Sequence, residues 1–373
     1  MYAASRTCQT THSTPSQRSH LSDMCAQMAT FQTLPEDLIY HIALNFEHDL
    51  AILHVLSQIC QSFHAATRAL LYRHVDAVVP RKRSLVLRSV HESPDLASLI
   101  TSWFLSLDAH DANGVIPELI TVLKFPNMGR LVLERSDNFY KIPSVSGGTH
   151  PMILRWEQLV EGRPATRDFE CSFLDRAEHD LQNIHTIELR DQFTTTELLR
   201  FMLIPNVRTL KAASLDRMPP ASLSATWSNQ KSNISRLEID GGWLWTMVPS
   251  TIHSILSHCP QLRVLHVRVP MVSDIQGGAE IYSQVNQPVI PAALQQMLEP
   301  VRHTLQELVM LNGRHKVPYD HSSTMNFSGF KALEKLEITS CCMMPPGPPC
   351  DARYGLSRSL PPKVRFLKVP DLH

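Results

Sequence analysis

The 373-residue chain carries 35 Lys and Arg against 35 Asp and Glu, so its formal net charge is zero. This balance excludes the overall electrostatic attraction on which binding to nucleic acid or to an anionic membrane usually depends. Hydrophobic residues make up 43% of the chain and charged residues 19%, which excludes a disordered or collagen-like protein and allows a sizeable core.

Residues 1–30 are polar, rich in Ser and Thr, and lack the apolar stretch of a secretory signal. Arg6 and Arg18 precede the first acidic residue, Asp23, as in a mitochondrial transit peptide, but the apolar face of such a peptide is missing. We therefore expect a disordered leader over residues 1–30.

Three apolar-periodic stretches between Phe31 and Val75 predict three short helices. The first follows Pro35, and Glu36 and Asp37 in its first turn suit the positive end of the helix dipole. The second stretch runs from Leu50 to Phe63, and the third covers residues 66–72. About 45 residues are too few for a full core, so some of these apolar side chains are expected to contact a partner protein.

The order and spacing of these blocks resemble an F-box, the helical motif that docks a protein onto the Skp-type adaptor of a cullin–RING ubiquitin ligase. The blocks are Leu34-Pro35-x-Asp37-Leu38-Ile39-x-x-Ile42, Leu56-x-x-Ile59-Cys60-x-x-Phe63 and Leu70-Leu71-Tyr72-Arg73. The resemblance covers residues 31–76, and it implies adaptor binding by Leu34, Pro35, Leu38, Ile39, Ile42, Leu56, Ile59, Cys60, Phe63, Leu71 and Tyr72. An ordinary helical cap that uses the same residues as core is the alternative.

From Pro126 onward the chain repeats the signature apolar-x-x-apolar-x-apolar. Five of the seven spacings between first positions lie between 23 and 31 residues, inside or near the period of leucine-rich repeats. The last two apolar positions of each signature share one face of an extended chain and predict a strand. The signatures are Met128/Leu131/Leu133, Ile184/Ile187/Leu189, Val207/Leu210/Ala212, Ile234/Leu237/Ile239, Leu262/Leu265/Val267, Leu305/Leu308/Met310, Leu333/Leu336/Ile338 and Val364/Leu367/Val369.

Helical stretches are predicted between several of these strands. Thr194 and Glu197 form a capping box, Ser250 is a candidate cap, and residues 294–301 keep helical spacing. Strand, helix and strand in steps of about 28 residues predict an α/β fold, a right-handed solenoid over residues 77–373. A doubly wound sheet would use the same elements, but no Gly-rich phosphate loop follows any strand.

The whole chain thus resembles a fungal-type F-box protein with irregular leucine-rich repeats. Residues 134–180 and 268–291 break the period, and the number of repeats within 134–183 stays open. No polar capping repeat follows Val369, which raises the alternative of a truncated C-terminus.

No catalytic motif or metal-ligand spacing is present. The eight cysteines form no C-x-x-C pair, and the sequence contains no H-E-x-x-H, G-x-S-x-G or phosphate-binding loop. With no signal peptide, the cysteines are expected to be reduced thiols of a cytoplasmic or nuclear protein. The longest uncharged stretch, residues 241–262, is interrupted by polar residues and two prolines, so no membrane span is expected. We therefore expect no cofactor and no enzymatic activity.

Positions three and five of each signature should point away from the core. These positions carry both signs of charge, which favours a protein ligand over a nucleic acid. The candidate target-binding residues are Arg130, Glu188, Lys211, Arg236, Glu238, His266, Glu307, Lys335 and Glu337, with Thr186, Thr209 and Lys368 on the same face.

Together these features predict the substrate-recognition subunit of a cullin–RING ubiquitin ligase. Its partners would be a Skp-type adaptor, through it a cullin, and an unknown target protein. The alternatives are an F-box scaffold that acts outside any ligase and an undetected hydrolase.

Overall fold

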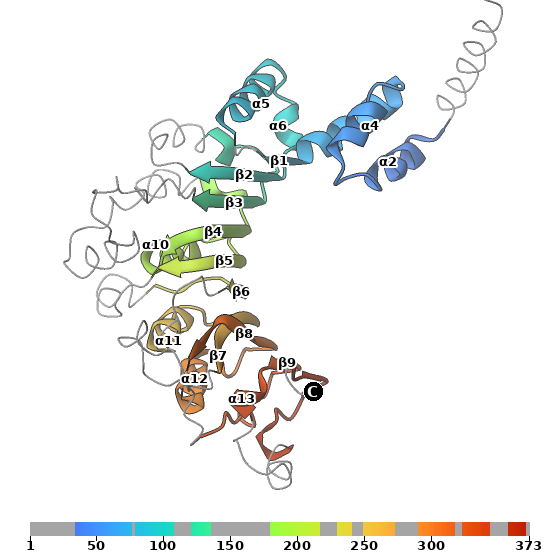
Figure 1. The fold of residues 1–373 in the computed structure, drawn as a ribbon. Helices are drawn as coiled ribbons and strands as arrows, with labels where there is room; N and C mark the ends of the chain where they lie inside the picture. Colours follow the sequence, from blue (N-terminus) through green and yellow to red (C-terminus); the bar gives the residue numbers. More distant parts are fainter. Residues whose placement is uncertain are drawn as a thin grey trace, which may run out of the picture. The chain divides into compact units, whose positions relative to one another are not determined.

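The computed structural model describes residues 34–76, 79–107, 121–135, 180–216, 230–240, 249–272, 290–317, 323–343 and 357–370 (Figure 1). The chain divides into two compact units, Met1–Val75 and Asp76–His373. The predicted leader, residues 1–30, lies outside the described residues, as do most of the two stretches that break the repeat.

The first unit consists of three packed helices, as predicted. They are α2 (Glu36–Leu44), α3 (Leu50–Leu56) and α4 (Gln61–Arg73). Asp49 caps α3, because its side chain accepts hydrogen bonds from the backbone N–H groups of Ala51 and Ile52 at 3.1 and 3.0 Å.

The boundary between the second and third helices differs from the prediction. The second apolar stretch was expected to run from Leu50 to Phe63, but α3 ends at Leu56 and Phe63 lies in α4. The backbone of Cys60 is extended, with φ −158° and ψ 171°, so one helix cannot continue through this residue.

The core of this unit lies between the three helices. Ala43, Leu53 and Leu70 are buried together, and Leu44, Phe46 and Leu71 pack against them. On α4 the hydroxyl of Thr67 is also buried, and it donates to the Phe63 carbonyl at 2.6 Å. An ion pair of 2.9 Å between Arg73 and Glu47 links the end of α4 to the loop after α2.

The second unit is built on a parallel sheet in which the strand order from β2 to β10 follows the sequence. Each strand from β2 to β9 pairs in parallel with the next one. The strands are β1 (His74–Asp76), β2 (Ser102–Leu107), β3 (Arg130–Arg135), β4 (Thr186–Thr194), β5 (Thr209–Asp216), β6 (Arg236–Ile239), β7 (Val264–Val272), β8 (Glu307–Val317), β9 (Lys335–Ile338) and β10 (Phe366–Lys368). This is the predicted leucine-rich-repeat-like α/β solenoid.

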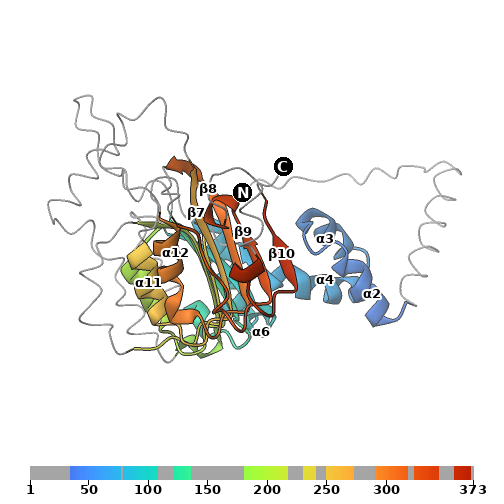
Figure 2. The same ribbon diagram turned by 90° about the horizontal axis from the view of Figure 1, so that it is seen from below.

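Short helices connect the strands, and α11 and α12 lie on one face of the sheet (Figure 2). The described helices of this unit are α5 (Pro80–Glu92), α6 (Leu96–Leu99), η2 (Asp180–Asn183), α10 (Thr195–Met202), α11 (Pro249–Ser257), α12 (Pro291–Met297), η5 (Glu299–Val301) and α13 (Ser340–Met343). The helix expected over 294–301 is split into α12 and η5. Pro300 explains the break, because it has no N–H to donate within an α-helix.

The strand register aligns the repeat signatures. Leu210 lies opposite Ile187 and Leu237, and Leu265 lies opposite Leu237 and Leu308. In seven of the eight predicted signatures all three apolar side chains are buried. The exception is the last signature, in which Leu367 on β10 is 38% exposed, because no described strand pairs with the outer edge of β10.

The structure also contains a strand that the repeat analysis missed. Ile100, Trp103 and Leu105 follow the same signature, are buried, and begin 28 residues before Met128. Trp103 lies opposite Leu131 in the register of β2 with β3. Within the described part of the chain, no helix has the length and apolar character needed to cross a membrane.

Candidate functional site: a charged ladder on the sheet

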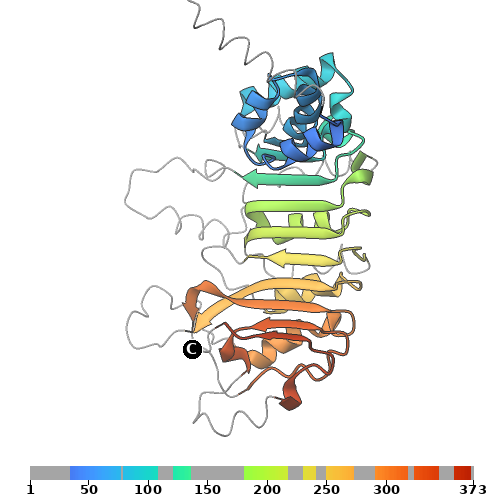
Figure 3. The ribbon, with the colours of Figure 1, turned by 90° about the vertical axis from the view of Figure 1, so that its right-hand side faces the viewer.

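Alternate residues of the strands turn away from the buried leucines and form a polar face. On β6 and β9 the pattern is strict: Arg236, Glu238, Lys335 and Glu337 are partly exposed, and the residues between them are buried. The strands that carry this face lie side by side (Figure 3). We call the following set of outward charged residues the ladder face: Arg130, Glu188, Arg190, Lys211, Arg236, Glu238, His266, Glu307, Lys335, Glu337 and Lys368.

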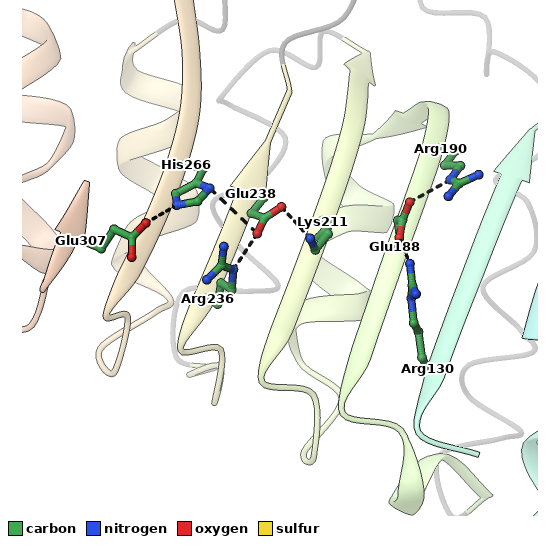
Figure 4. Close-up of polar contacts among 8 residues, drawn as sticks. All are labelled: Arg130, Glu188, Arg190, Lys211, Arg236, Glu238, His266 and Glu307. Carbon is green, nitrogen blue, oxygen red and sulfur yellow. Dashed lines mark hydrogen bonds and ion pairs between the residues drawn. The ribbon is translucent and has the colours of Figure 1, made fainter. Parts of the chain in front are cut away.

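Glu188 on β4 is held by two arginines (Figure 4). One carboxylate oxygen accepts from Arg130 of the neighbouring strand β3 at 2.6 Å. The other accepts from Arg190, two residues further along β4, at 2.8 Å. Arg190 also lies over the ring of Phe104 on β2, 4.9 Å from its centroid. Both oxygens of Glu188 are therefore occupied.

Glu238 on β6 repeats this arrangement two strands away (Figure 4). Its two oxygens pair with Arg236 at 2.6 Å and with Lys211 of β5 at 2.9 Å. His266 of β7 lies 3.9 Å from the oxygen that Arg236 contacts. The second carboxylate of the ladder is thus also enclosed by cationic or titratable groups.

The ladder continues through β7 to β10. His266 and Lys335 both contact the same oxygen of Glu307, each at 2.8 Å. Lys368 on β10 donates to Glu337 on β9 at 2.7 Å. Most of these pairs join neighbouring strands, so they fix side chains across the sheet as well as along it.

The cations hold the glutamates in their ionised form. Burial alone would raise the pKa of Glu188, but hydrogen bonds and charge from Arg130 and Arg190 outweigh it, so this pKa lies below its usual value. The pKa values of Glu238 and Glu307 are lowered in the same way: burial opposes the shift, and Lys211, Arg236, Lys335 and His266 overcome it.

This geometry predicts a specific loss of stability in acid. A carboxyl whose folded pKa lies below its unfolded value stabilises the fold above the unfolded value, about 4.3 to 4.5, and that contribution disappears as the pH falls through the folded pKa. In Glu238→Gln the contribution is absent at every pH. We expect the free energy of unfolding, from urea titrations between pH 6 and pH 3, to fall less steeply for Glu238→Gln than for the unmodified protein.

The matched control is Glu92→Gln. Glu92 makes an exposed pair with Arg88 at 3.7 Å on α5, and such pairs contribute little to stability. We expect the free energy of unfolding of Glu92→Gln to depend on pH as it does in the unmodified protein. If Glu92→Gln flattened this dependence as much as Glu238→Gln, a special role for the ladder face would be contradicted.

The structure places all nine candidate target-binding residues on the ladder face, from β3 to β9. Three further residues of this face were not predicted from the sequence: Arg190, and the pair of Arg268 with Asp240, whose guanidinium and carboxylate are 2.5 Å apart. All three residues occupy the next outward position after the signature. Extending the alternation by two residues would have found them.

The residues that resemble an adaptor-binding motif divide between surface and interior of the first unit. Pro35 and Leu38 are exposed, and Leu34, Ile42, Leu56, Ile59, Cys60, Leu71 and Tyr72 are partly exposed. Ile39 and Phe63 are 1% exposed. These two side chains form the interior of the unit, so they support its surface and do not contribute to it.

Possible metal ligands and cysteines also occur in the described part of the chain. No group of three or more His, Cys, Asp or Glu side chains there is placed to hold a metal ion. Burial raises the pKa of the Cys259 thiol to about 12, against the opposing charge of Lys231, so this cysteine is not an activated nucleophile.

Comparison with known proteins adds a fold likeness. No protein-family model matches the chain, and no curated protein matches it significantly. Among solved structures the chain is similar to the leucine-rich repeat domain of the type III effector XopL, at 12% identity and a TM-score of 0.33, over 90% of this chain and 96% of that one. At these values the likeness supports no argument about function, and the strand register defines the solenoid.

Proposed function

We propose that this protein is the substrate-recognition subunit of a cullin–RING ubiquitin ligase. The helical unit would dock onto a Skp-type adaptor, and the ladder face of the solenoid would bind the target protein. The proposal joins the F-box resemblance of residues 31–76 to the solenoid, and it places the protein in the cytoplasm or the nucleus.

The observation that carries the proposal is the exposed apolar surface of the small helical unit. Leu38 is 46% exposed although it belongs to the leucine–proline block of the motif, and Pro35 is exposed beside it. A unit of three short helices that buries Ile39 but leaves these side chains in solvent has the character of a docking surface.

The solenoid contributes a surface for a second protein. Its outward positions carry ion-paired side chains of both signs, while the leucines of each signature are buried. Bringing a target close to a ubiquitin-loaded enzyme raises the effective concentration of the reacting groups, and this role requires no acid, base or nucleophile from the receptor itself.

Affinity purification of the full chain from cells tests the proposal. We expect a Skp-type adaptor and a cullin to co-purify, together with ubiquitinated proteins. Recovery of the adaptor without a cullin would favour the scaffold alternative. Recovery of neither would overturn the proposal, and a hydrolase would then be sought with ester and peptide substrates.

A sharper test replaces the exposed block. The double variant Leu34→Ala/Pro35→Ala is expected to weaken adaptor binding about 30-fold, because truncating a buried interface residue costs about 2 kcal/mol. Affinity would be measured by titrating purified adaptor, with circular dichroism to establish that the variant is folded.

Val55→Ala is the matched control. Val55 is 61% exposed on α3 of the same unit but belongs to none of the three blocks of the motif. It should bind the adaptor as the unmodified protein does. A folded Leu34→Ala/Pro35→Ala variant with unchanged affinity would remove the basis for the F-box assignment.

A further inference from the structure

The ladder face exposes its cations more than its carboxylates. The side chains of Arg130, Arg190, Lys211 and Arg236 are 38–44% exposed, whereas those of Glu188 and Glu238 are 17% and 20% exposed. Sequence alone indicates a face of alternating sign. The structure shows that a molecule approaching β3–β6 meets mainly the positive groups.

The hydrogen-bonding groups that remain for a ligand on these strands are also mainly donors. Glu188 and Glu238 each use both carboxylate oxygens on neighbouring cations. A guanidinium has five N–H donors and an ammonium has three, and the ion pairs of Arg130, Lys211 and Arg236 on this face engage one nitrogen of each. Donors therefore remain for a ligand on these strands, whereas the two acceptors are largely used.

The charge count agrees with this bias. At the first two outward positions of β3–β6, the three cations Arg130, Lys211 and Arg236 surround the two carboxylates Glu188 and Glu238, so this cluster carries 3 − 2 = +1. The carboxylates act as counter-ions that fix the cations in place and reduce their mutual repulsion. A ligand with carboxylates of its own would meet pre-positioned partners.

The cluster is also elongated. Its cations come from strands β3, β5 and β6, and neighbouring strands lie about 4.8 Å apart. Three such steps cover roughly 14 Å, the length of about four to five residues of extended chain at 3.3–3.6 Å per residue. A short extended peptide that crosses the strands can reach all three cations, whereas a single small anion cannot.

Acidic residues limit where such a peptide can lie. At the next outward position, Glu134 lies opposite Arg190 in the register, and Asp240 is more exposed than its partner Arg268. These carboxylates would repel an acidic ligand. The favourable path therefore crosses the first two outward positions of β3–β6, where Arg130, Lys211 and Arg236 originate.

From these observations we infer that the ladder face binds an extended segment of the target protein that is rich in Asp and Glu. The inference specifies the ligand of the target-binding surface and so rests on the proposed function. Recognition consists of carboxylate-to-cation hydrogen bonds across β3–β6, with no covalent step.

The test uses the full-length protein and a fluorescein-labelled ten-residue peptide of alternating Glu and Ser, followed by fluorescence anisotropy. We expect saturable binding that weakens as salt rises from 50 to 300 mM, and at least tenfold weaker binding of the matching Gln/Ser peptide. Equal affinity for the two peptides would overturn the inference, as would tighter binding of a single-stranded DNA of the same length.

Variants locate the binding. Arg130→Gln/Arg236→Gln should weaken binding of the acidic peptide about tenfold. The control Lys331→Gln/Lys363→Gln removes two exposed cations from turns outside the ladder face and should stay within about twofold of the unmodified protein. Equal effects of the two double variants would place the binding elsewhere.

A third variant is expected to raise the affinity for the acidic peptide. Glu188→Gln/Glu238→Gln removes the counter-ions and should tighten binding of the acidic peptide several-fold, an effect that structural damage would not produce. Weaker binding by a folded form of this variant would contradict the inference.

The adaptor titration separates this inference from the proposed function. Adaptor binding without peptide binding would refute the inference and leave the proposed function standing. If the protein binds the acidic peptide but not the adaptor, the proposed function is refuted and the inference about the ladder face stands.

Discussion

Leu237→Ala is expected to lower the free energy of unfolding of the solenoid by about 2–5 kcal/mol. Leu237 is completely buried at the centre of β6, with Leu210 and Leu265 opposite it on the neighbouring strands. Removing its isobutyl group leaves a cavity between two repeats. Because each repeat of a solenoid is stabilised mainly by its neighbours, the loss affects the interfaces on both sides. Urea denaturation followed by circular dichroism provides the measurement.

Leu367→Ala is the control for this effect. Leu367 occupies the same signature position in β10, opposite Leu336, but it is 38% exposed at the edge of the described sheet. The same chemical change should cost less than about 1 kcal/mol there, since little apolar area returns to water. Equal losses for the two variants would mean that burial of the signature leucine does not determine stability.

The strands and their buried face could be predicted because the signature alternates over a fixed period. Leu131 and Leu133 share a face by the geometry of an extended chain, and the register then stacks them against Ile187 and Leu189. Each strand is short, yet the pattern recurs at intervals of about 28 residues. Repetition therefore supplied information that a single strand of this length lacks.

The difference in exposure between cations and carboxylates could not be predicted. It depends on contacts between residues far apart in the sequence, such as Arg130 with Glu188, 58 positions away. The sequence indicates which residues point outward, but not that a short Glu side chain lies low on the sheet while its Arg partners extend past it. The bias toward positive charge becomes visible only when strand register and side-chain length are combined.

The helical unit shows a second limit of sequence reasoning. Apolar spacing correctly predicted three helices, but it assigned Phe63 to the second of them, because periodicity continues through the turn at Cys60. The F-box resemblance also placed Ile39 together with Leu38 among the adaptor-binding residues. Neighbouring residues on a helix point about 100° apart, and here one is buried and the other exposed.

The missed strand β2 provides a final test of the repeat architecture. Its signature escaped the repeat analysis because Trp103 occupies a position that is Leu or Ile in the strands from β3 to β9. Trp103 is 1% exposed and meets Phe125 edge-on, with ring centroids 6.1 Å apart and an interplanar angle of 68°. The Trp103 side chain therefore packs in the core of the first repeat, next to Leu131 of β3.

Trp103→Ala should therefore destabilise the solenoid by about 3–5 kcal/mol, among the largest effects of a single core substitution. Phe104→Ala is the neighbouring control: Phe104 points outward beneath Arg190, and its loss should cost about 1 kcal/mol or less. Both free energies would come from urea denaturation followed by far-ultraviolet circular dichroism. Because side chains alternate along a strand, a larger loss for Phe104→Ala than for Trp103→Ala would mean that β2 is shifted by one residue against β3, and that the first repeat does not follow the signature of the others.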